Sequence, residues 1–149
     1  MLEIYFDGSY DHNGNNRASY GYVIYKNKSE IKNDYGVLDE LFENGNRLNG
    51  NTTIVESAAL EKALDYLITE NIIDSLKVYS DNHGLVNMLN DNCCKSKIEI
   101  QRLFISRLKR KLLNFNGANN VVITRIRREQ NSKADRLSRI PLKENNLNK

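Results

Sequence analysis

Three strand-like segments with short turns between them fill the first 38 residues, and this pattern constrains the fold most. Residues 2–7, 19–26 and 30–38 have the alternation, or the β-branched and aromatic content, of strands. Residues 8–18 are turn-rich, with Asn and Gly prominent, and only Asn27 to Ser29 separate the second segment from the third. Strands with such short connections pair as antiparallel neighbours. The sequence therefore predicts an antiparallel meander.

Strand and helix signals alternate through the rest of the chain, after a loop rich in Asn and Gly at 39–51. We expect helices at 52–70, 82–89, 96–115 and 132–138, and strands at 76–80 and 121–126. Pro141 is expected to stop the last helix, leaving a polar, disordered tail. A meander followed by this alternation predicts a mixed sheet with helices packed on its faces.

The length and composition bound the class of protein. A chain of 149 residues is about one domain, which we place at 1–140 with a tail at 141–149. No apolar stretch approaches the roughly 20 residues of a membrane span. The two cysteines, Cys93 and Cys94, are adjacent, and two alone make neither a disulfide framework nor a zinc site. These features predict a cytoplasmic monomer without membrane contact.

Charge is distributed unevenly along the chain. Residues 1–94 carry 7 Lys or Arg against 15 Asp or Glu, whereas residues 95–149 carry 15 against 4. An acidic part that collects cations beside a basic part that neutralises phosphates suits a metal-dependent phosphodiester enzyme. The alternative is that surface lysines and arginines simply crowd the second half.

Four acidic residues lie where predicted elements begin or end: Asp7, Glu56, Asp81 and Asp135. Carboxylates far apart in sequence can converge at the carboxyl ends of neighbouring strands, where their oxygens would bind Mg²⁺ or Mn²⁺.

Each of the four also has an ordinary interpretation. Asp7 before Gly8 fits a turn, and Glu56 fits a first-turn acid at a helix dipole. Asp81 fits a helix N-cap, and Asp135 fits an ion pair with Arg139 at i+4.

Four strings around these residues resemble, in order, the type 1 ribonuclease H family, over about residues 1–140. They are Tyr5-Phe6-Asp7-Gly8-Ser9, the helix entry Thr52 to Leu60 (TTIVESAAL), Tyr79-Ser80-Asp81-Asn82, and Arg128 to Ser138 (REQNSKADRLS). The last is similar to the ending of the reverse-transcriptase-like branch. Each string alone is weak evidence, and the four in order are specific.

The resemblance implies an α/β ribonuclease H-like fold, with a five-stranded mixed sheet of three antiparallel strands followed by parallel strands. It also implies a two-metal hydrolase of the RNA strand in RNA–DNA hybrids, using two divalent cations, Mg²⁺ or Mn²⁺. Asp7 would bridge both ions, Glu56 and Asp81 would hold the leaving-group side, and Asp135 the nucleophile side. Double-stranded RNA and RNA–DNA junctions are further candidate partners.

The resemblance also marks substrate-binding candidates, since an enzyme that selects RNA must sense its 2′-hydroxyl groups. These candidates are Gly8, Ser9, Tyr10, Thr52, Thr53, Asn82, Arg128 and Asn131. Helix capping is the alternative for Thr52, Thr53 and Asn82.

Two features depart from the family pattern. Many members have a histidine in the loop before the last aspartate, whereas residues 124–130 contain none, and His12 and His83 are read as surface residues. Arg128 or Glu129 would partly substitute. The span 91–120 is too short for the basic protrusion of some members, and the helix face with Arg102, Lys109, Arg110 and Lys111 is the candidate replacement.

Two other functions stay open at this point. One is a module of the same fold that binds hybrid or double-stranded RNA without cutting it, although a pure binder gains nothing from four negative charges near phosphate. The other is a different nuclease of the superfamily, such as a resolvase or exonuclease.

Overall fold

A computed structural model of the chain describes residues 1–11, 17–38, 52–91, 99–115 and 120–147. The elements in chain order are β1 (Leu2–Tyr10), β2 (Ala18–Lys26), β3 (Ser29–Val37), α1 (Thr52–Thr69), β4 (Leu76–Ser80), α2 (His83–Asn90), α3 (Glu99–Leu112), β5 (Val121–Arg125), the short 3₁₀ helix η5 (Arg128–Asn131) and α4 (Ser132–Leu147).

The five strands form one mixed sheet in the order β3-β2-β1-β4-β5. The pairs β1–β2 and β2–β3 are antiparallel, and β1–β4 and β4–β5 are parallel. Asn27 and Lys28 both have positive φ angles, of 51° and 71°, which suit the two-residue hairpin between β2 and β3. The predicted α/β fold class, with its antiparallel and parallel parts, is confirmed.

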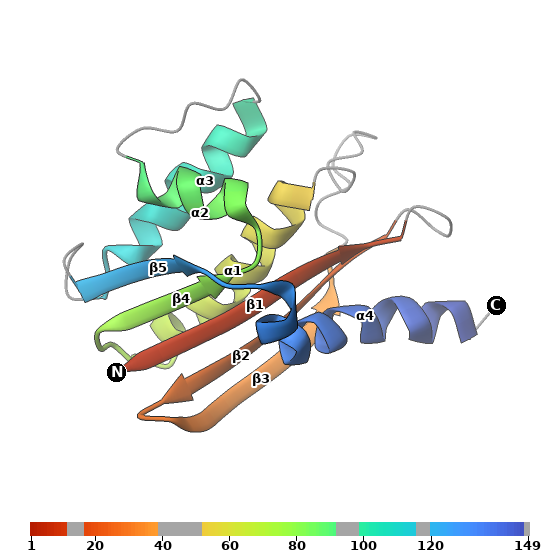
Figure 1. Ribbon diagram of the computed structural model, residues 1–149, viewed down its shortest axis with the longest axis horizontal. Coiled ribbons are helices and arrows are strands. Elements are labelled where there is room, and N and C mark those ends of the chain that lie inside the picture. The colour runs from red at the N-terminus through yellow and green to blue at the C-terminus, as the bar shows by residue number, and fades with distance from the viewer. Residues whose placement is uncertain (12–16, 39–51, 92–98, 116–119, 148–149) are drawn as a thin grey trace.

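Helices cover both faces of the sheet (Figure 1). The helices α1, α2 and α3 lie on one face, and η5 and α4 lie on the other. Alternation along β1 explains this arrangement, since Leu2, Ile4 and Phe6 point into the core beneath α1, whereas Glu3 and Asp7 point to the opposite face. Burial of the apolar side chains on the α1 face supplies most of the driving force for folding.

Two predicted element bounds that concern residues of the candidate site are wrong. The strand β1 does not end at Asp7 but continues to Tyr10, because residues 8–10 pair with Tyr20, Ser19 and Ala18 of β2. This pairing overrides the turn preference of Gly8 and Ser9. Asp7 therefore lies within a strand and is not a turn aspartate.

The last helix also runs further than predicted, because Pro141 lies inside α4. A proline removes one backbone hydrogen bond, which kinks a helix and does not end it when packing holds the turns on both sides. Pro141 is buried, which is consistent with such packing. Residues 142–147 are thus helical, and the predicted disordered tail is wrong for them.

Several predictions fall outside the described residues: the Asn13-Gly14 turn, the loop 39–51, His12 and the cysteine pair. None of the described helices is long and apolar enough to cross a membrane.

Candidate metal-dependent active site

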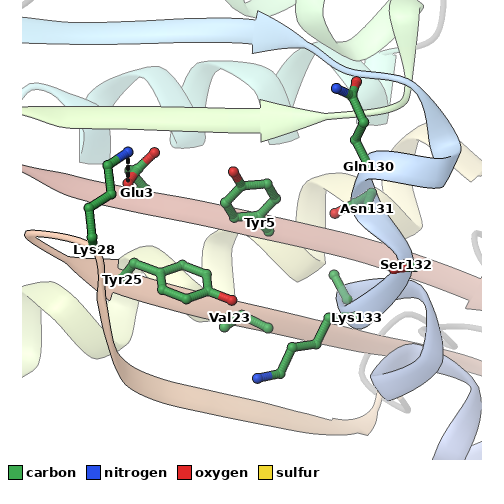
Figure 2. Close-up of a pocket in the computed structure, with 10 residues that line it drawn as sticks. Glu3, Tyr5, Val23, Tyr25, Lys28, Gln130, Asn131, Ser132 and Lys133 are labelled. Carbon is green, nitrogen blue, oxygen red and sulfur yellow. Dashed lines mark hydrogen bonds and ion pairs between the residues drawn. The ribbon is translucent and has the colours of Figure 1, made fainter.

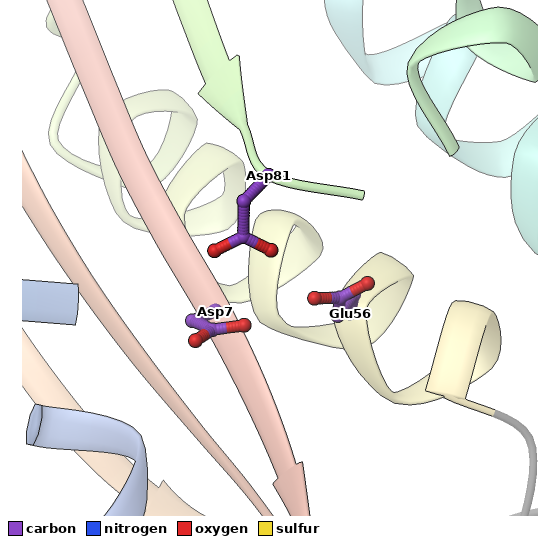
Figure 3. A group of neighbouring side chains, drawn as sticks. All are labelled: Asp7, Glu56 and Asp81. Carbon is purple, nitrogen blue, oxygen red and sulfur yellow. The ribbon is translucent and has the colours of Figure 1, made fainter. Parts of the chain in front are cut away.

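Three of the four predicted carboxylates meet at one end of the sheet (Figure 3). Asp7, Glu56 and Asp81 each offer a carboxylate oxygen, and these oxygens lie within 4.8 Å of one another. They come from β1, from α1 and from the residue that follows β4. Carboxylate oxygens are hard donors, and a cluster of this kind suits Mg²⁺ or Mn²⁺.

Asp135 lines the same cavity, which has a volume of about 460 Å³. It is not one of the close cluster of three, but its side chain is hydrogen-bonded to that of Asp7. Its Oδ1 accepts a hydrogen bond of 3.2 Å from Arg139 Nε, so the ion pair suggested by the sequence does form. Asp135 therefore pairs with Arg139 and also lines the cavity.

Each carboxylate of the cluster is held by an amide donor. The backbone N–H of Gly8 donates to Asp7 Oδ1 at 2.9 Å, and the Asn131 side chain donates to Asp81 Oδ2 at 3.0 Å. The Asn82 side chain donates to Glu56. These bonds orient oxygens that would otherwise repel one another at close range.

Asp7 cannot ionise easily in this setting. Burial raises the pKa of Asp7 to about 10, and a hydrogen bond with Glu56 and the charge of Asp81 add to the rise. Burial also raises the pKa of Glu56, although hydrogen bonds from Asp7 and Asn82 oppose that rise. The cluster therefore retains a proton that a divalent cation would displace, so its carboxylates fit such an ion.

The raised pKa of Asp7 predicts how stability depends on pH. The folded chain holds the Asp7 proton more tightly than the unfolded chain does, and this difference stabilises the folded state. The stabilisation is complete below the unfolded pKa of about 4 and is lost as pH rises towards about 10. Without divalent ions, the free energy of unfolding should fall between pH 5 and 9. Urea denaturation across that range measures the slope, and saturating Mg²⁺ should flatten it. A slope that is equal with and without Mg²⁺ would contradict the prediction.

Gly8 allows β1 to approach α1 and thereby brings Asp7 close to Glu56. A Cβ atom at Gly8 would lie 2.6 Å from Val55 Cγ1 and 3.1 Å from the backbone nitrogen of Glu56. We expect Gly8→Ala to push α1 away and destabilise the fold by about 1–3 kcal/mol, and Mn²⁺ affinity should weaken with it. Thermal denaturation and Mn²⁺ titration check this, with Gly84→Ala as control, since its Cβ would meet only Asn82 Oδ1 at 3.4 Å.

The predicted substrate contacts divide into two groups. Gly8, Ser9, Tyr10, Thr52, Asn82 and Arg128 line the cavity, whereas Thr53 and Asn131 do not. Thr52 and Thr53 are the first two residues of α1, and Glu56 lies beyond the first turn, so the dipole interpretation of Glu56 is wrong. The side chain of Ser9 is hydrogen-bonded to Ser138 of α4, with 2.7 Å between the two oxygens.

The two asparagines act on the carboxylates. Asn82, and not Asp81, is the N-cap of α2, because its Oδ1 accepts the Leu85 N–H at 3.0 Å while its nitrogen donates to Glu56. Asn131 is 1% exposed, and its Nδ2 bonds the Phe6 carbonyl and Asp81. A buried residue of this kind positions Asp81 and does not reach a substrate in the cavity.

Arg139 and Leu142 also line the cavity and were not among the predicted site residues. With Asp135 they follow the spacing i, i+4, i+7 along one face of α4. This spacing is the signal that could have identified Arg139 and Leu142. It was missed because the helix was expected to end at Ser138.

The predicted basic face of α3 is partly used inside the protein. Lys111 is paired with Asp65 and with Glu61 of α1, and Lys109 donates to the backbone carbonyl of Asp91. Arg102 and Arg110 are exposed. The face therefore helps to dock α3, and its use for nucleic acid remains a prediction for the two arginines.

Comparison with solved structures identifies the fold. A ribonuclease H1 from the halophilic archaeon Halobacterium salinarum superposes with a TM-score of 0.79 at 19% identity, covering 96% of this chain and 98% of that one. The chain has the ribonuclease H fold. No protein-family model matches the sequence, and no curated protein matches it.

Two further ribonuclease H structures are similar. A ribonuclease H1 isolated from compost, solved in complex with an RNA/DNA hybrid, has a TM-score of 0.77 at 20% identity and covers 97% and 98% of the two chains. The N-terminal ribonuclease H domain of a Mycobacterium tuberculosis protein has a TM-score of 0.72 at 18% identity, with coverage of 91% and 88%. Identities this low establish the shared ribonuclease H fold and not the chemistry.

Proposed function

We propose that this chain is a ribonuclease H that hydrolyses the RNA strand of RNA–DNA hybrids with two divalent cations. The observation that carries the proposal is the close cluster of Asp7, Glu56 and Asp81 in a cavity that Asp135 also lines. The ribonuclease H fold supports it, since one structural neighbour was solved with an RNA/DNA hybrid.

Asp7, Glu56, Asp81 and Asp135 would hold the ions. Bound Mg²⁺ or Mn²⁺ would polarise the scissile phosphate and lower the pKa of a coordinated water. Asp7 interacts with Glu56, Asp81 and Asp135, and it is the residue that we expect to contact both ions. Asn82 and Asn131 fix the orientation of Glu56 and Asp81, so the ligand oxygens are in place before ions bind.

Two arginines would contribute charge at the rim of the cavity. Arg128 and Arg139 both line it, and a guanidinium group matches the planar geometry of a phosphate. They offset the negative potential of four carboxylates, which would otherwise repel the backbone of a nucleic acid. Ser9, Tyr10 and Thr52 offer hydroxyl groups at the same cavity, which suits recognition of the 2′-hydroxyl groups of RNA.

The test is a cleavage assay on a labelled RNA–DNA hybrid, with Mg²⁺, with Mn²⁺ and with EDTA. We expect cleavage of the RNA strand only when a cation is present, and a loss of about 10³-fold in Asp81→Asn, which removes a ligand charge while keeping the shape. Asp34→Asn is the matched control, because Asp34 lies on β3 away from the cavity. No cleavage by the wild type, or equal cleavage by Asp81→Asn, would refute the proposal.

The same assay separates the alternatives. Cutting of a DNA duplex or of a four-way junction in place of the hybrid would assign the chain to another nuclease class. Tight hybrid binding without any cleavage would assign it to the binding modules.

A further inference from the structure

The strand β3 is an outer edge of the sheet and carries exposed apolar side chains. It is nine residues long, and in the described part of the chain it pairs with β2 alone (Figure 1). Ile31 is 37% exposed and Tyr35 is 40% exposed. A long edge strand with free backbone groups and exposed apolar side chains is a template to which another strand can add.

The backbone groups that a partner strand could use are those of Asn33 and Tyr35. The Leu38 N–H donates to the Ala18 carbonyl at 2.8 Å, so Leu38 faces β2. Successive residues of a strand turn their backbone groups to opposite sides, so Asp34 also faces β2, whereas Asn33 and Tyr35 face away from the sheet. The Tyr35 N–H accordingly donates to Asp34 Oδ1, at 2.8 Å, and not to β2.

The side chains on either side of Asn33 carry opposite charges. Lys32 Nζ lies 5.1 Å from the centre of the Tyr66 ring of α1. Asp34 Oδ2 accepts a hydrogen bond of 3.3 Å from the Tyr20 hydroxyl. Both side chains are partly exposed on the α1 face of the sheet, so a partner strand could reach a cation and an anion there.

A third charge of this strand, Glu30, is already used within the chain. Lys133 extends from α4 towards β3 (Figure 2), and its ammonium group is ion-paired with Glu30. The Asn33 side chain donates to the same carboxylate at 2.9 Å. The charges that the middle of this edge offers to a partner are therefore those of Lys32 and Asp34.

We propose that β3 pairs with β3 of a second copy of the chain, in antiparallel orientation about a two-fold axis at Asn33. The Asn33 backbone then donates to, and accepts from, the partner's Asn33. Lys32 lies opposite the partner's Asp34, and Asp34 lies opposite the partner's Lys32. Ile31 lies opposite the partner's Tyr35, so the exposed apolar side chains cover one another. A β-bulge at Ile31 in the pairing with β2 bounds the stretch.

The charges select this register over its neighbours. An axis at Lys32 would place two lysines opposite each other, and an axis at Asp34 would place two aspartates there, and both arrangements are repulsive. An axis at Asn33 gives two attractive pairs, which is the self-complementarity that a two-fold interface requires.

The dimer is weak, and it leaves the acidic cavity open. The paired stretch is short, and the Tyr35 N–H must leave Asp34 to reach the partner strand, so dimerisation depends on concentration. None of the described residues that line the acidic cavity belongs to β3. The dimer therefore does not depend on the proposed function.

Sedimentation equilibrium of the full chain in EDTA is the first test. Between about 10 µM and about 1 mM we expect a monomer–dimer equilibrium with a dissociation constant on the order of 0.1 mM. A chain that stays monomeric at about 1 mM would overturn the proposal. Assemblies larger than a dimer would also overturn it, because a two-fold contact closes on itself.

Charge reversal assigns the dimer to β3. Asp34→Lys and Lys32→Asp should each weaken it about tenfold or more, because both cross-strand pairs become repulsive. An equimolar mixture of the two variants should dimerise like the wild type, since every lysine then faces an aspartate. Glu70→Lys changes the net charge as much as Asp34→Lys, from an exposed position outside β3, and should dimerise normally. A mixture that stays monomeric, or equal dimerisation of Asp34→Lys and Glu70→Lys, would refute the pairing.

A proline at the axis tests the backbone bonds separately. Proline has no N–H, and an edge strand tolerates it where that N–H points away from the sheet. We expect Asn33→Pro to be a folded monomer by circular dichroism and sedimentation, whereas Asn33→Ala should dimerise like the wild type. Equal dimerisation of the two variants would show that the Asn33 backbone is not at the interface, against the proposal.

Discussion

Asp7→Asn should reduce hybrid cleavage by about 10³-fold or more and at the same time stabilise the ion-free protein. The loss of activity follows because Asp7 interacts with Glu56, Asp81 and Asp135, and each tenfold loss corresponds to about 1.4 kcal/mol of transition-state stabilisation. The gain in stability follows because a neutral amide replaces a buried acid whose pKa is raised. We expect about 1–3 kcal/mol at pH 8.

Urea denaturation at pH 5 and pH 8 in EDTA, beside the hybrid assay, measures both effects. The variant should gain more stability at pH 8 than at pH 5, because the unfolded wild type releases the Asp7 proton as pH rises while the folded wild type keeps it, which lowers the stability of the wild type. Asp91→Asn changes an exposed aspartate outside the acidic cavity and should alter neither property. A variant that is less stable than wild type at pH 8 would show that Asp7 is not under electrostatic strain.

Gly21→Ala should weaken both folding and activity by displacing α4, the helix that carries Asp135. A Cβ atom at Gly21 would lie 2.5 Å from the Ser138 backbone nitrogen and 2.7 Å from the Ala134 carbonyl oxygen. Backbone atoms cannot turn aside as a side chain can, so the whole helix must shift. We expect a destabilisation of about 1–3 kcal/mol and a loss of roughly 10- to 100-fold in cleavage rate.

Thermal denaturation and hybrid cleavage check this expectation. Gly36→Ala is the matched control, because the three atoms nearest its Cβ all belong to the Tyr20 side chain, which can move. If Gly21→Ala cleaved as fast as Gly36→Ala at a temperature where both are folded, close docking of α4 would not be required for the placement of Asp135.

The sequence predicted the fold where local signals and tertiary packing agree. The strand Leu76–Ser80 matches its expected bounds because it is buried and ends where Asp81 begins the next turn. Prediction from the sequence failed where packing overrides local preference. The strand β1 continues through Gly8 because β2 pairs with it, and α4 continues through Pro141.

The site shows the same division. Motif resemblance brought out the carboxylates, since each lies in a short local string. The roles of Asn82 and Asn131 depend on partners far away in sequence, Glu56 and Asp81, which no local pattern reveals. Asn131 was therefore expected to contact substrate, whereas the structure buries it beneath the cluster.

The docking of α4 on β1 joins segments far apart in the sequence, since Ser9 and Ser138 meet although 129 positions separate them. The acidic cavity needs residues from the first strand and from the last helix. During synthesis on a ribosome, therefore, the acidic cavity is not complete until α4 has emerged. Any property of the cavity that needs Asp135 therefore arises only after α4 has emerged.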